Sequence, residues 1–319
     1  MKVLITGANG LLATHTIREL LARGYKVRGF LRNHKKIIPS LAGSIELIEG
    51  DIRSMEDVDQ AVKQCDHVIH NAAATDPSVS SYKFFQHINV YGTHNIIQAA
   101  KHHKVKKLVY VSTANTMGHG NKKTPGNETS PPEIPFIRSP YVRSKIESEQ
   151  LALTESENIP LVIVNPSFMT GSYGSGNGSD KIVRMGMKKH IVFYPPGGKN
   201  FIHVEDAARG LVNALKKGKT GERYLLCNEN LTYQEFFTKV KALSPHNPTL
   251  IKIPPYILIT AGYLGSLARM AGLKTSFSIN NAKILCTENY YTGDKARELL
   301  PEQLQTIDKA IADTIAWLS

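Results

Sequence analysis

Cysteine is scarce in this chain: only Cys65, Cys227 and Cys286 occur among 319 residues. Their number is odd and they lie far apart, which excludes a disulfide framework and the close cysteine pairs of a zinc site. We therefore expect buried thiols in a reducing compartment and no metal site. Because the chain opens on an apolar strand pattern and not on a secretory leader, the expected location is the cytoplasm.

Long uncharged runs are also rare. The run Ile253 to Ala268 is short for a bilayer span and contains prolines and glycines, so it predicts a buried or cleft-lining helix and no integral membrane segment. Acidic residues are in deficit, since 39 Lys and Arg face 27 Asp and Glu, a net charge of +12 that suits a phosphate-bearing ligand. The basic residues are dispersed without a basic and aromatic platform, so nucleic acid is not an expected partner.

The first 22 residues carry the most informative pattern. An apolar run at 3–5 leads into Thr6-Gly7-Ala8-Asn9-Gly10-Leu11-Leu12-Ala13, and a helix with apolar residues at i, i+3 and i+4 follows. Gly7 permits the tight turn, Gly10 lets the backbone approach a pyrophosphate, and the helix N-terminus supplies free N–H donors. This context predicts nucleotide binding and not a plain turn. A second match at residues 170–176 follows Pro166 in a glycine-rich stretch and indicates a loop.

The end of the second expected strand, residues 25–31, bears on cofactor choice. An acidic residue there binds the ribose hydroxyls of NAD, whereas an Arg accommodates the 2′-phosphate of NADP. The chain has Leu31 followed by Arg32, with Lys35 and Lys36 close behind. This pattern favours NADP, with NAD as the alternative and a solvated basic turn as the structural explanation.

Further candidate residues follow the other apolar strands. Because the carboxyl ends of parallel strands meet at one edge of an open sheet, these residues are expected to gather there. They are Asp51 and Ile52 after the strand at 45–48, Asn71, Ala72 and Ala73 after 67–70, Thr113 after 108–112, and Pro166 and Ser167 after 161–164.

A helix from about Tyr141 to Ser156 carries Tyr141 and Lys145, which lie four residues apart and therefore on one face. It follows a strand that ends in Ser-Thr and a loop rich in Gly, Pro and Asn at 118–140, a suitable setting for a catalytic pair. Tyr291 and Lys295 have the same spacing, but Gly293 interrupts them. They therefore need not share a helix face.

The ordered motifs resemble those of the extended short-chain dehydrogenases/reductases, which include the NAD-dependent epimerases/dehydratases and the dihydroflavonol-reductase-like enzymes. The resemblance covers essentially the whole chain and also includes Asn89 and His203-Val204-Glu205-Asp206. The latter motif opens a helix, where Asp206 is better placed for capping than for chemistry. It implies an α/β Rossmann fold with a doubly wound parallel sheet and a smaller, mostly helical C-terminal substrate lobe. The expected division is 1–165 and 199–227 for the nucleotide-binding core and 166–198 and 228–319 for the lobe.

The resemblance also implies roles for these residues. Thr113, Tyr141 and Lys145 would be catalytic: Thr113 would bind the substrate oxygen, Tyr141 would handle a proton, and Lys145 would lower the pKa of that phenol and hold the nicotinamide ribose. The implied cofactor-binding residues are Gly7, Asn9, Gly10, Leu11, Leu12, Arg32, Asp51, Ile52, Asn71, Ala72, Ala73, Asn89, Tyr141, Lys145, Pro166 and Ser167.

Three functions remain open at this point. The first is an NADP-dependent oxidoreductase that reduces a ketone or aldehyde, or oxidises the alcohol, of a small apolar or ring substrate. The second is a nucleotide-sugar epimerase that uses NAD as a transient hydride acceptor, with Lys199 as a phosphate contact. Dehydration is disfavoured because Ala114 and Asn115, and not an Asp-Glu pair, follow Thr113. The third is a redox-sensing NADP-binding protein, and family resemblance further suggests a homodimer built from helices 82–103 and 141–156.

Overall fold

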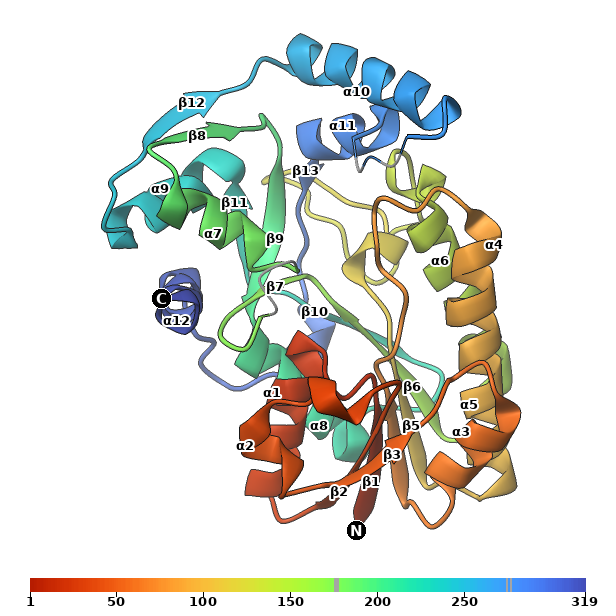
Figure 1. Cartoon of the computed structure of the whole chain (residues 1–319). Helices are drawn as coiled ribbons and strands as arrows, with labels where there is room; N and C mark the ends of the chain where they lie inside the picture. Colours follow the sequence, from red (N-terminus) through yellow and green to blue (C-terminus); the bar gives the residue numbers. More distant parts are fainter. Residues whose placement is uncertain (175–177, 274, 276) are drawn as a thin grey trace.

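The computed structural model describes residues 1–174, 178–273, 275 and 277–319. Its main unit is a seven-stranded sheet in the order β10-β6-β5-β4-β1-β2-β3, with every neighbouring pair parallel (Figure 1). This order is that of a doubly wound nucleotide-binding sheet, so the predicted Rossmann fold is confirmed. The strands are β1 Lys2–Thr6, β2 Lys26–Leu31, β3 Glu46–Glu49, β4 His67–His70, β5 Lys107–Val111, β6 Leu161–Pro166 and β10 Arg223–Leu226.

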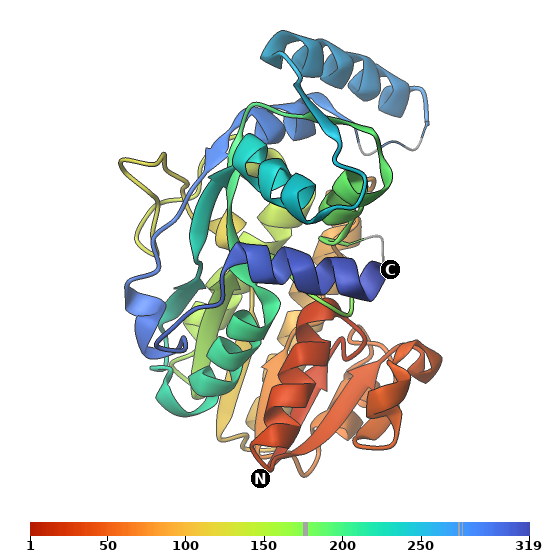
Figure 2. The same cartoon turned by 90° about the vertical axis from the view of Figure 1, so that its left-hand side faces the viewer.

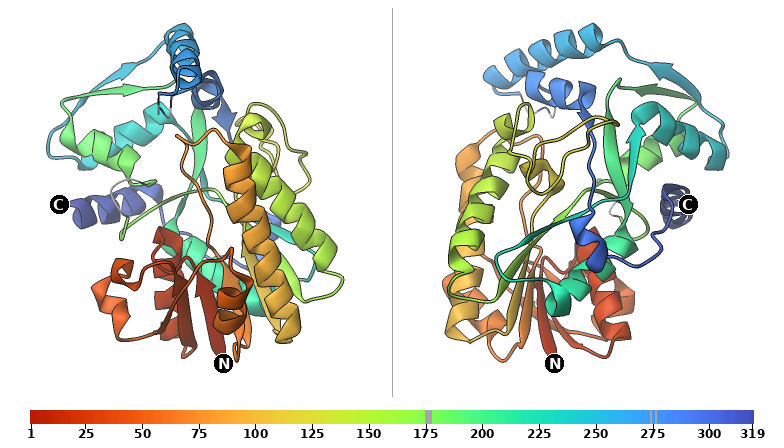
Figure 3. Two further views of the ribbon diagram at one scale, coloured as in Figure 1. Left: turned by 45° about the vertical axis from the view of Figure 1, so that its right-hand side comes forward. Right: turned by 180° about the vertical axis from the view of Figure 1, so that it is seen from behind.

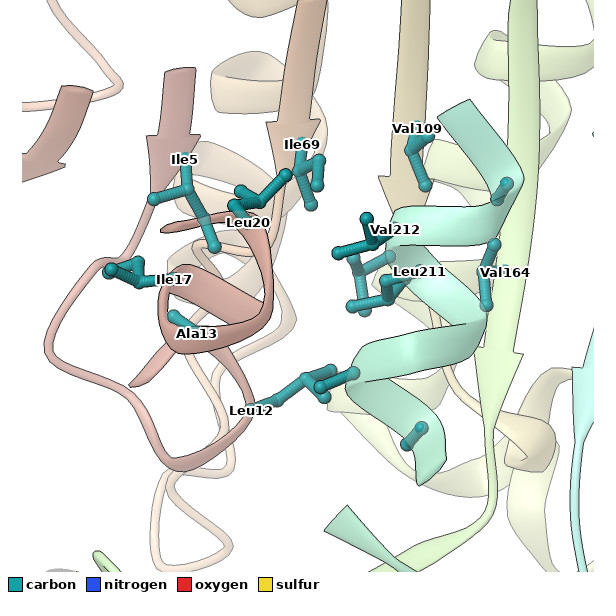
Figure 4. Close-up of a cluster of buried hydrophobic side chains, with 14 of the residues drawn as sticks. Ile5, Leu12, Ala13, Ile17, Leu20, Ile69, Val109, Val164, Leu211 and Val212 are labelled. Carbon is teal, nitrogen blue, oxygen red and sulfur yellow. The ribbon is translucent and has the colours of Figure 1, made fainter. Parts of the chain in front are cut away.

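Helices cover both faces of this sheet, because its central strands are apolar on both sides. Figure 4 shows α1 and α8 against one face, where their apolar side chains meet those of β1, β4, β5 and β6. On the other face, α3, α5 and α6 pack on a second apolar cluster. The helices are α1 Leu11–Ala22, α2 Pro39–Ala42, α3 Met55–Val62, α4 Tyr82–Phe85, α5 Tyr91–His102, α6 Pro140–Glu155 and α8 Val204–Lys217.

A smaller lobe lies beyond the carboxyl edge of the sheet. It contains a sheet in the order β11-β9-β13 with β7 paired to β9, a separate β8–β12 pair, and five helices. Helix α12 belongs to this lobe and lies across the middle of the molecule in Figure 2. The elements are β7 Phe168–Thr170, α7 Lys181–Lys188, β8 Ile191–Tyr194, β9 Gly198–His203, β11 Glu229–Thr232, α9 Tyr233–Leu243, β12 Thr249–Lys252, α10 Pro255–Met270, α11 Ile279–Cys286, β13 Glu288–Asn289 and α12 Ile307–Leu318.

Short helical turns join these elements. One of them, a π-helical turn at Gln86–Val90, connects α4 to α5, so the predicted helix 82–103 forms with one wider turn that contains Asn89. The 3-10 turns are η1 His34–Lys36, η3 Ala114–Thr116, η4 Phe136–Arg138 and η5 Lys295–Glu298. Helix α9 begins with a capping box, in which Thr232 and Glu235 are bonded reciprocally.

Two local predictions are wrong. Residues 253–268 were expected to form a buried or cleft-lining helix, yet α10 presents most of its large side chains to solvent, because it packs through glycines. Asp206 was expected to cap α8, but the N-cap is His203, and the buried Asp206 carboxylate accepts the Gln305 backbone N–H at 2.7 Å. In the described ranges, no helix is long and apolar enough to cross a membrane.

Candidate active site

The glycine turn between β1 and α1 has the geometry that its sequence predicts. Gly7 has a φ of +67°, and a Cβ built on it would lie 2.9 Å from the Ala72 Cα, so this position requires glycine. Gly10 is the N-cap of α1, and its N–H donates to the Gly7 carbonyl at 2.9 Å. Asn9 is exposed in the turn, whereas the Leu12 side chain is buried in the core, so any contact of Leu12 with a nucleotide would be through its backbone.

A buried hydrogen-bond chain holds the strand ends behind this turn. The Thr6 hydroxyl oxygen accepts the backbone N–H groups of Asn71 and Ala72 at 3.1 and 3.0 Å, so its own proton points to His70 Nδ1 at 2.8 Å. His70 Nε2 then donates to Thr93, which donates to the Asn89 carbonyl. Burial lowers the pKa of His70 to about 3, so the ring is neutral. The motif search missed His70 and Thr93, because a buried His after a strand carries no spacing signal.

At the adenosine side of the turn, Arg32 directly follows β2 and is exposed. Within the described residues it forms no hydrogen bond or ion pair, so its guanidinium is available to a ligand. Asp51 is occupied by Arg53, which donates to both carboxylate oxygens and holds the pKa of Asp51 below its usual value. Ile52 is buried against Gly92, where a Cβ would approach it to 2.6 Å.

Asn89 is engaged with the protein itself. Its side-chain oxygen accepts the Ala74 N–H at 2.8 Å, and its Nδ2 donates to the Ala74 carbonyl and to the Ser144 hydroxyl at 3.2 and 2.9 Å. The residue is 1% exposed. In this arrangement Asn89 links the segment after β4 to α6, and its expected contact with the cofactor stays a prediction.

Tyr141 and Lys145 lie on one face of α6 and meet Thr113 at the end of β5. Lys145 is 2% exposed, its Nζ donates to the Val111 carbonyl at 2.8 Å, and it lies 4.3 Å from the centroid of the Tyr110 ring. Burial lowers the pKa of Lys145 to about 7. Burial also raises the pKa of Tyr141 to about 12, and a hydrogen bond with the Thr113 side chain opposes that effect.

A buried carboxylate that the sequence analysis did not single out lies one turn beyond Lys145. Glu149 accepts the Thr116 hydroxyl at 2.6 Å and the Asn165 Nδ2 at 2.5 Å, and Arg223 approaches it at 3.4 Å. Asn165 also donates to the Thr113 carbonyl at 3.1 Å. The charge of Glu149 raises the pKa of Lys145 against the effect of burial. Its position at i+4 from Lys145 was the signal that could have identified it.

A cavity of about 90 Å³ lies between the ends of β5 and β6 and the lobe. The predicted residues Thr113, Pro166 and Ser167 line it, so the structure brings these three together. Of the other residues that line this cavity, the sequence predicted only Lys199 as a possible ligand contact. These residues are Ala114, Asn115, Phe168, Lys199, Asn200, Asn289 and Tyr291.

Several groups in this cavity lack a protein partner. The Ser167 hydroxyl and the Asn289 side-chain oxygen are buried and have no hydrogen-bond partner in the part of the chain that the structure describes. The Lys199 ammonium lies 4.9 Å from the Phe168 ring centroid, forms no ion pair with a described residue, and has a pKa lowered by burial to about 8. Unpaired polar groups of this kind are what a bound polar ligand would satisfy.

Tyr141 lines a second cavity, of about 250 Å³, and does not line the first. Phe85, Pro77 and Val79 supply apolar surface to it, and Arg269 reaches it from α10. Tyr141 therefore faces a space large enough for a small organic molecule, with apolar and polar groups in its wall.

The loop at 118–140 is attached both to the segment after β13 in the lobe and to β10 of the main sheet. The Gly120 and Gly126 N–H groups donate to the Tyr290 carbonyl at 3.1 and 3.0 Å, and the Glu128 carboxylate accepts the Leu225 N–H at 3.0 Å. Tyr291 is buried, and its hydroxyl donates to the Ala114 carbonyl at 3.0 Å, whereas Lys295 lies in η5 and pairs with Glu222. The second Tyr-x-x-x-Lys match thus serves packing and does not form a pair.

The residues present fit a dinucleotide on structural grounds. Gly7 leaves a cradle that a Cβ would fill, and the N-terminus of α1 faces the same turn. At the far end, the Ser167 hydroxyl has no partner among the described residues. In the described residues, the three-residue His, Cys, Asp or Glu cluster compatible with a metal is Asp59 with His102 and His103, whose groups already bond to one another at the end of α5.

Comparisons with known proteins agree with this geometry. A profile of the NAD dependent epimerase/dehydratase family matches residues 3–227. A Synechocystis protein named as a candidate dihydroflavonol 4-reductase is 26% identical over 320 residues, covering 98% of this chain and 93% of its own. Sterol-4-alpha-carboxylate 3-dehydrogenase, decarboxylating, of Candida albicans is 25% identical over 99% of this chain and 97% of its own. The crystal structure of gox2253 superposes with a TM-score of 0.84 at 27% identity, covering 99% and 97% of the two chains.

The chain belongs to the NAD dependent epimerase/dehydratase family. Within it, the protein is an NAD(P)-dependent oxidoreductase of the extended short-chain dehydrogenase/reductase type.

Proposed function

We propose that the protein is an NADP(H)-dependent reductase that converts a ketone or aldehyde of a small apolar or ring compound to the alcohol, or catalyses the reverse reaction. The observation that carries this proposal is the hydrogen bond between the side chains of Thr113, which lines one cavity, and Tyr141, which lines the other, with Lys145 one turn along α6. Sterol and dihydroflavonol substrates, named for the two relatives, are ring compounds and support the substrate class. The expected outcome is NADPH consumption with cyclic ketones and none with sugar nucleotides.

The proposed mechanism assigns one task to each of the three side chains. When bound, the nicotinamide supplies or accepts the hydride. The Thr113 hydroxyl holds the substrate oxygen. As that oxygen gains negative charge, Tyr141 donates its phenolic proton to it. Because burial raises the pKa of Tyr141 to about 12, its phenolate needs stabilisation by a neighbouring cation. We assign this role to Lys145, on the same face of α6.

The choice of NADP over NAD rests on Arg32. This exposed guanidinium follows β2. Positions 31 and 32 are Leu and Arg, so neither offers a carboxylate to bind the ribose hydroxyls of NAD. A fluorescence titration should give binding of NADPH about tenfold or more tighter than NADH, as one charge-assisted contact supplies. Arg32→Ser should remove the difference and Lys36→Ser should retain most of it. Preference for NADH by the unaltered protein would refute the assignment.

A nucleotide-sugar epimerase is the second candidate, and Lys199 favours it specifically. An unpaired ammonium in the wall of the Thr113 cavity could contact a diphosphate. This function requires NAD that stays bound through purification and interconversion of UDP-sugars without net NADPH consumption. A redox-sensing protein without chemistry would instead show no turnover, and Tyr141→Phe would change nothing.

A homodimer is part of the same proposal. Helices α4, α5 and α6 run side by side on one face of the molecule (Figure 3), and Phe84 and Tyr91 expose apolar surface there. Pairing of this face with its copy would form a four-helix bundle. Light scattering should give twice the chain mass of 35.2 kDa, and a monomer at all concentrations would exclude this bundle.

A further inference from the structure

Helix α10 has an apolar face, but it turns this face to solvent and not to the core. A helix on a protein surface usually turns its large apolar side chains to the core and its polar ones to water. In α10 the residues at one face are large, apolar and exposed: Tyr256 is 70% exposed, Leu264 63%, Leu267 59% and Met270 83%. Ile257 and Tyr263 border the same face, because Ile257 lies seven residues before Leu264 and Tyr263 lies four residues before Leu267.

Small residues hold the opposite face of α10 to the protein. A Cβ on Gly262 would lie 2.8 Å from the Ala282 Cβ of α11, and one on Gly265 would lie 2.3 Å from the Phe277 carbonyl oxygen. The Arg269 guanidinium turns inward, where it donates to the Thr275 and Pro77 carbonyls at 2.7 and 3.0 Å. Close backbone packing therefore fixes α10 with its apolar face outward. The helix is not a loosely attached core helix.

The apolar surface continues along the outer edge of the lobe. In Figures 1 and 2, the β8–β12 pair and α10 follow one another along this edge, on the far side from the amino-terminal strand. Ten large apolar side chains here are exposed, which is more than single scattered residues on a soluble surface would give. They are Ile191, Phe193, Ile251, Tyr256, Ile257, Tyr263, Leu264, Leu267, Met270 and Leu273, and we call them the apolar edge.

The two chain segments that carry most of the apolar edge hold charged residues of one sign, although Lys199 lies in the cavity wall, Arg269 turns inward, and Lys239 pairs with Glu229 and Asp308. No Asp or Glu occurs between Asp180 and Glu205, the segment that contains β8, or between Glu235 and Glu288, which contains β12 and α10. These two segments carry eleven Lys and Arg residues. A second copy of this chain would bring like charges together, whereas an anionic lipid surface complements both the apolar face and the positive surroundings.

We propose that the apolar edge docks the protein on the surface of a bilayer that contains anionic lipid. Helix α10 has 16 residues, about 24 Å of length, so it lies along the interface and does not span it. Tyr256 and Tyr263 suit the headgroup level, with an apolar ring and a polar hydroxyl. The leucines and Met270 enter the acyl boundary.

Docking would also place the substrate cavity close to the lipid. Arg269 of α10 and Ser278, Asn280 and Asn281 at the start of α11 line the same cavity as Tyr141. An apolar substrate dissolved in the bilayer could therefore reach Tyr141 beneath α10. This step rests on the proposed function, whereas the docking itself does not.

Flotation of the purified full-length protein with vesicles tests the docking. Vesicles of phosphatidylcholine with phosphatidylglycerol should bind the protein, salt should weaken the binding, and phosphatidylcholine alone should bind it several-fold less. The double variant Leu264→Ser and Leu267→Ser keeps the net charge and should weaken binding by about tenfold or more, since two exposed leucines lose apolar contact. Met270→Glu should weaken it, and Met55→Glu, the same change on α3, should not.

Hydrogen exchange on the unaltered protein avoids dependence on variants that fail to fold. Vesicles should protect residues 255–273 and leave α4 and α5 unchanged. Absence of vesicle binding, binding unaffected by the leucine changes, or protection elsewhere would overturn the proposal. So would a concentration-dependent dimer that the leucine variant dissociates in the absence of lipid, because a second copy would then occupy the edge. Loss of reductase activity with normal vesicle binding would refute only the proposed function.

Discussion

Replacing the buried Lys145 should stabilise the cofactor-free protein while removing its activity. The side chain is 2% exposed, and burial lowers its pKa from 10.5 to about 7. At 1.36 kcal/mol for each pKa unit, the folded state bears an unfavourable free energy of about 5 kcal/mol when the ammonium is charged. Lys145→Met retains the aliphatic stem and removes this cost, a trade of stability against activity that functional sites often show.

The pH dependence gives the sign of this effect. Below pH 7 the group is protonated in both the folded and unfolded states, so the full cost of burying the charge is present. Between about pH 7 and pH 10.5 the folded protein releases the proton and the unfolded chain keeps it, so the stability of the unaltered protein rises with pH. The advantage of Lys145→Met in free energy of unfolding should therefore be largest at pH 6 to 7. It should shrink by up to about 1.4 kcal/mol for each pH unit above that.

Urea denaturation of the cofactor-free protein at a series of pH values measures this difference. Lys199→Met is the matched control, because the pKa of Lys199 is lowered only to about 8. The advantage of this variant in free energy of unfolding should therefore begin to shrink about one pH unit higher than that of Lys145→Met. The reasoning is refuted if Lys145→Met is less stable than the unaltered protein at pH 6, or if the difference between the two does not change with pH.

Two other substitutions test neighbouring parts of the site. Gly7→Ala places a side chain at a φ of +67° and a Cβ 2.9 Å from the Ala72 Cα, so the free energy of unfolding should fall by about 1–3 kcal/mol. In this variant NADPH should no longer raise the melting temperature measured by thermal shift. Full stabilisation by NADPH in that variant would contradict the turn as the pyrophosphate site. Glu149→Gln keeps the acceptor for Thr116 and Asn165 but removes the charge that raises the pKa of Lys145, so the alkaline limb of the pH–rate profile should move to lower pH. An unchanged limb would show that Glu149 acts only through packing.

The main sheet could be predicted because its signals are local. Strands β1, β5 and β6 contain continuous apolar runs, and the turn after β1 requires glycine at a position with positive φ, which only a few residue types tolerate. Thr113, Pro166 and Ser167 could be placed together for the same reason, since they end adjacent strands. The remaining placements in the main sheet depended on the order in which the parallel strands pair, which joins residues far apart in the sequence.

The lobe could not be predicted to the same depth. Its strands have two to six residues and depend on partners more than twenty residues away, as in the pairing of Lys199 with Asn289. The outward face of α10 was missed because composition alone cannot tell which side of an apolar helix meets the core, and glycines at 262 and 265 reverse the usual choice. His70 was missed because its role arises from buried hydrogen bonds that no sequence spacing encodes. Glu149 does lie four residues after Lys145, but the spacing alone does not show that its carboxylate is buried and bonded to Thr116 and Asn165.

Transfer of deuterium tests the proposed reaction most directly. NADPH labelled with deuterium at C4 of the nicotinamide is incubated with the protein and cyclic ketones of the panel, and the alcohols are analysed by mass spectrometry. The account predicts one deuterium on the carbinol carbon of the product, with transfer reduced by a factor of about 10² or more in Tyr141→Phe. Absence of label from every alcohol, or equal transfer by Tyr141→Phe, would contradict hydride transfer to a released product with Tyr141 as the proton donor.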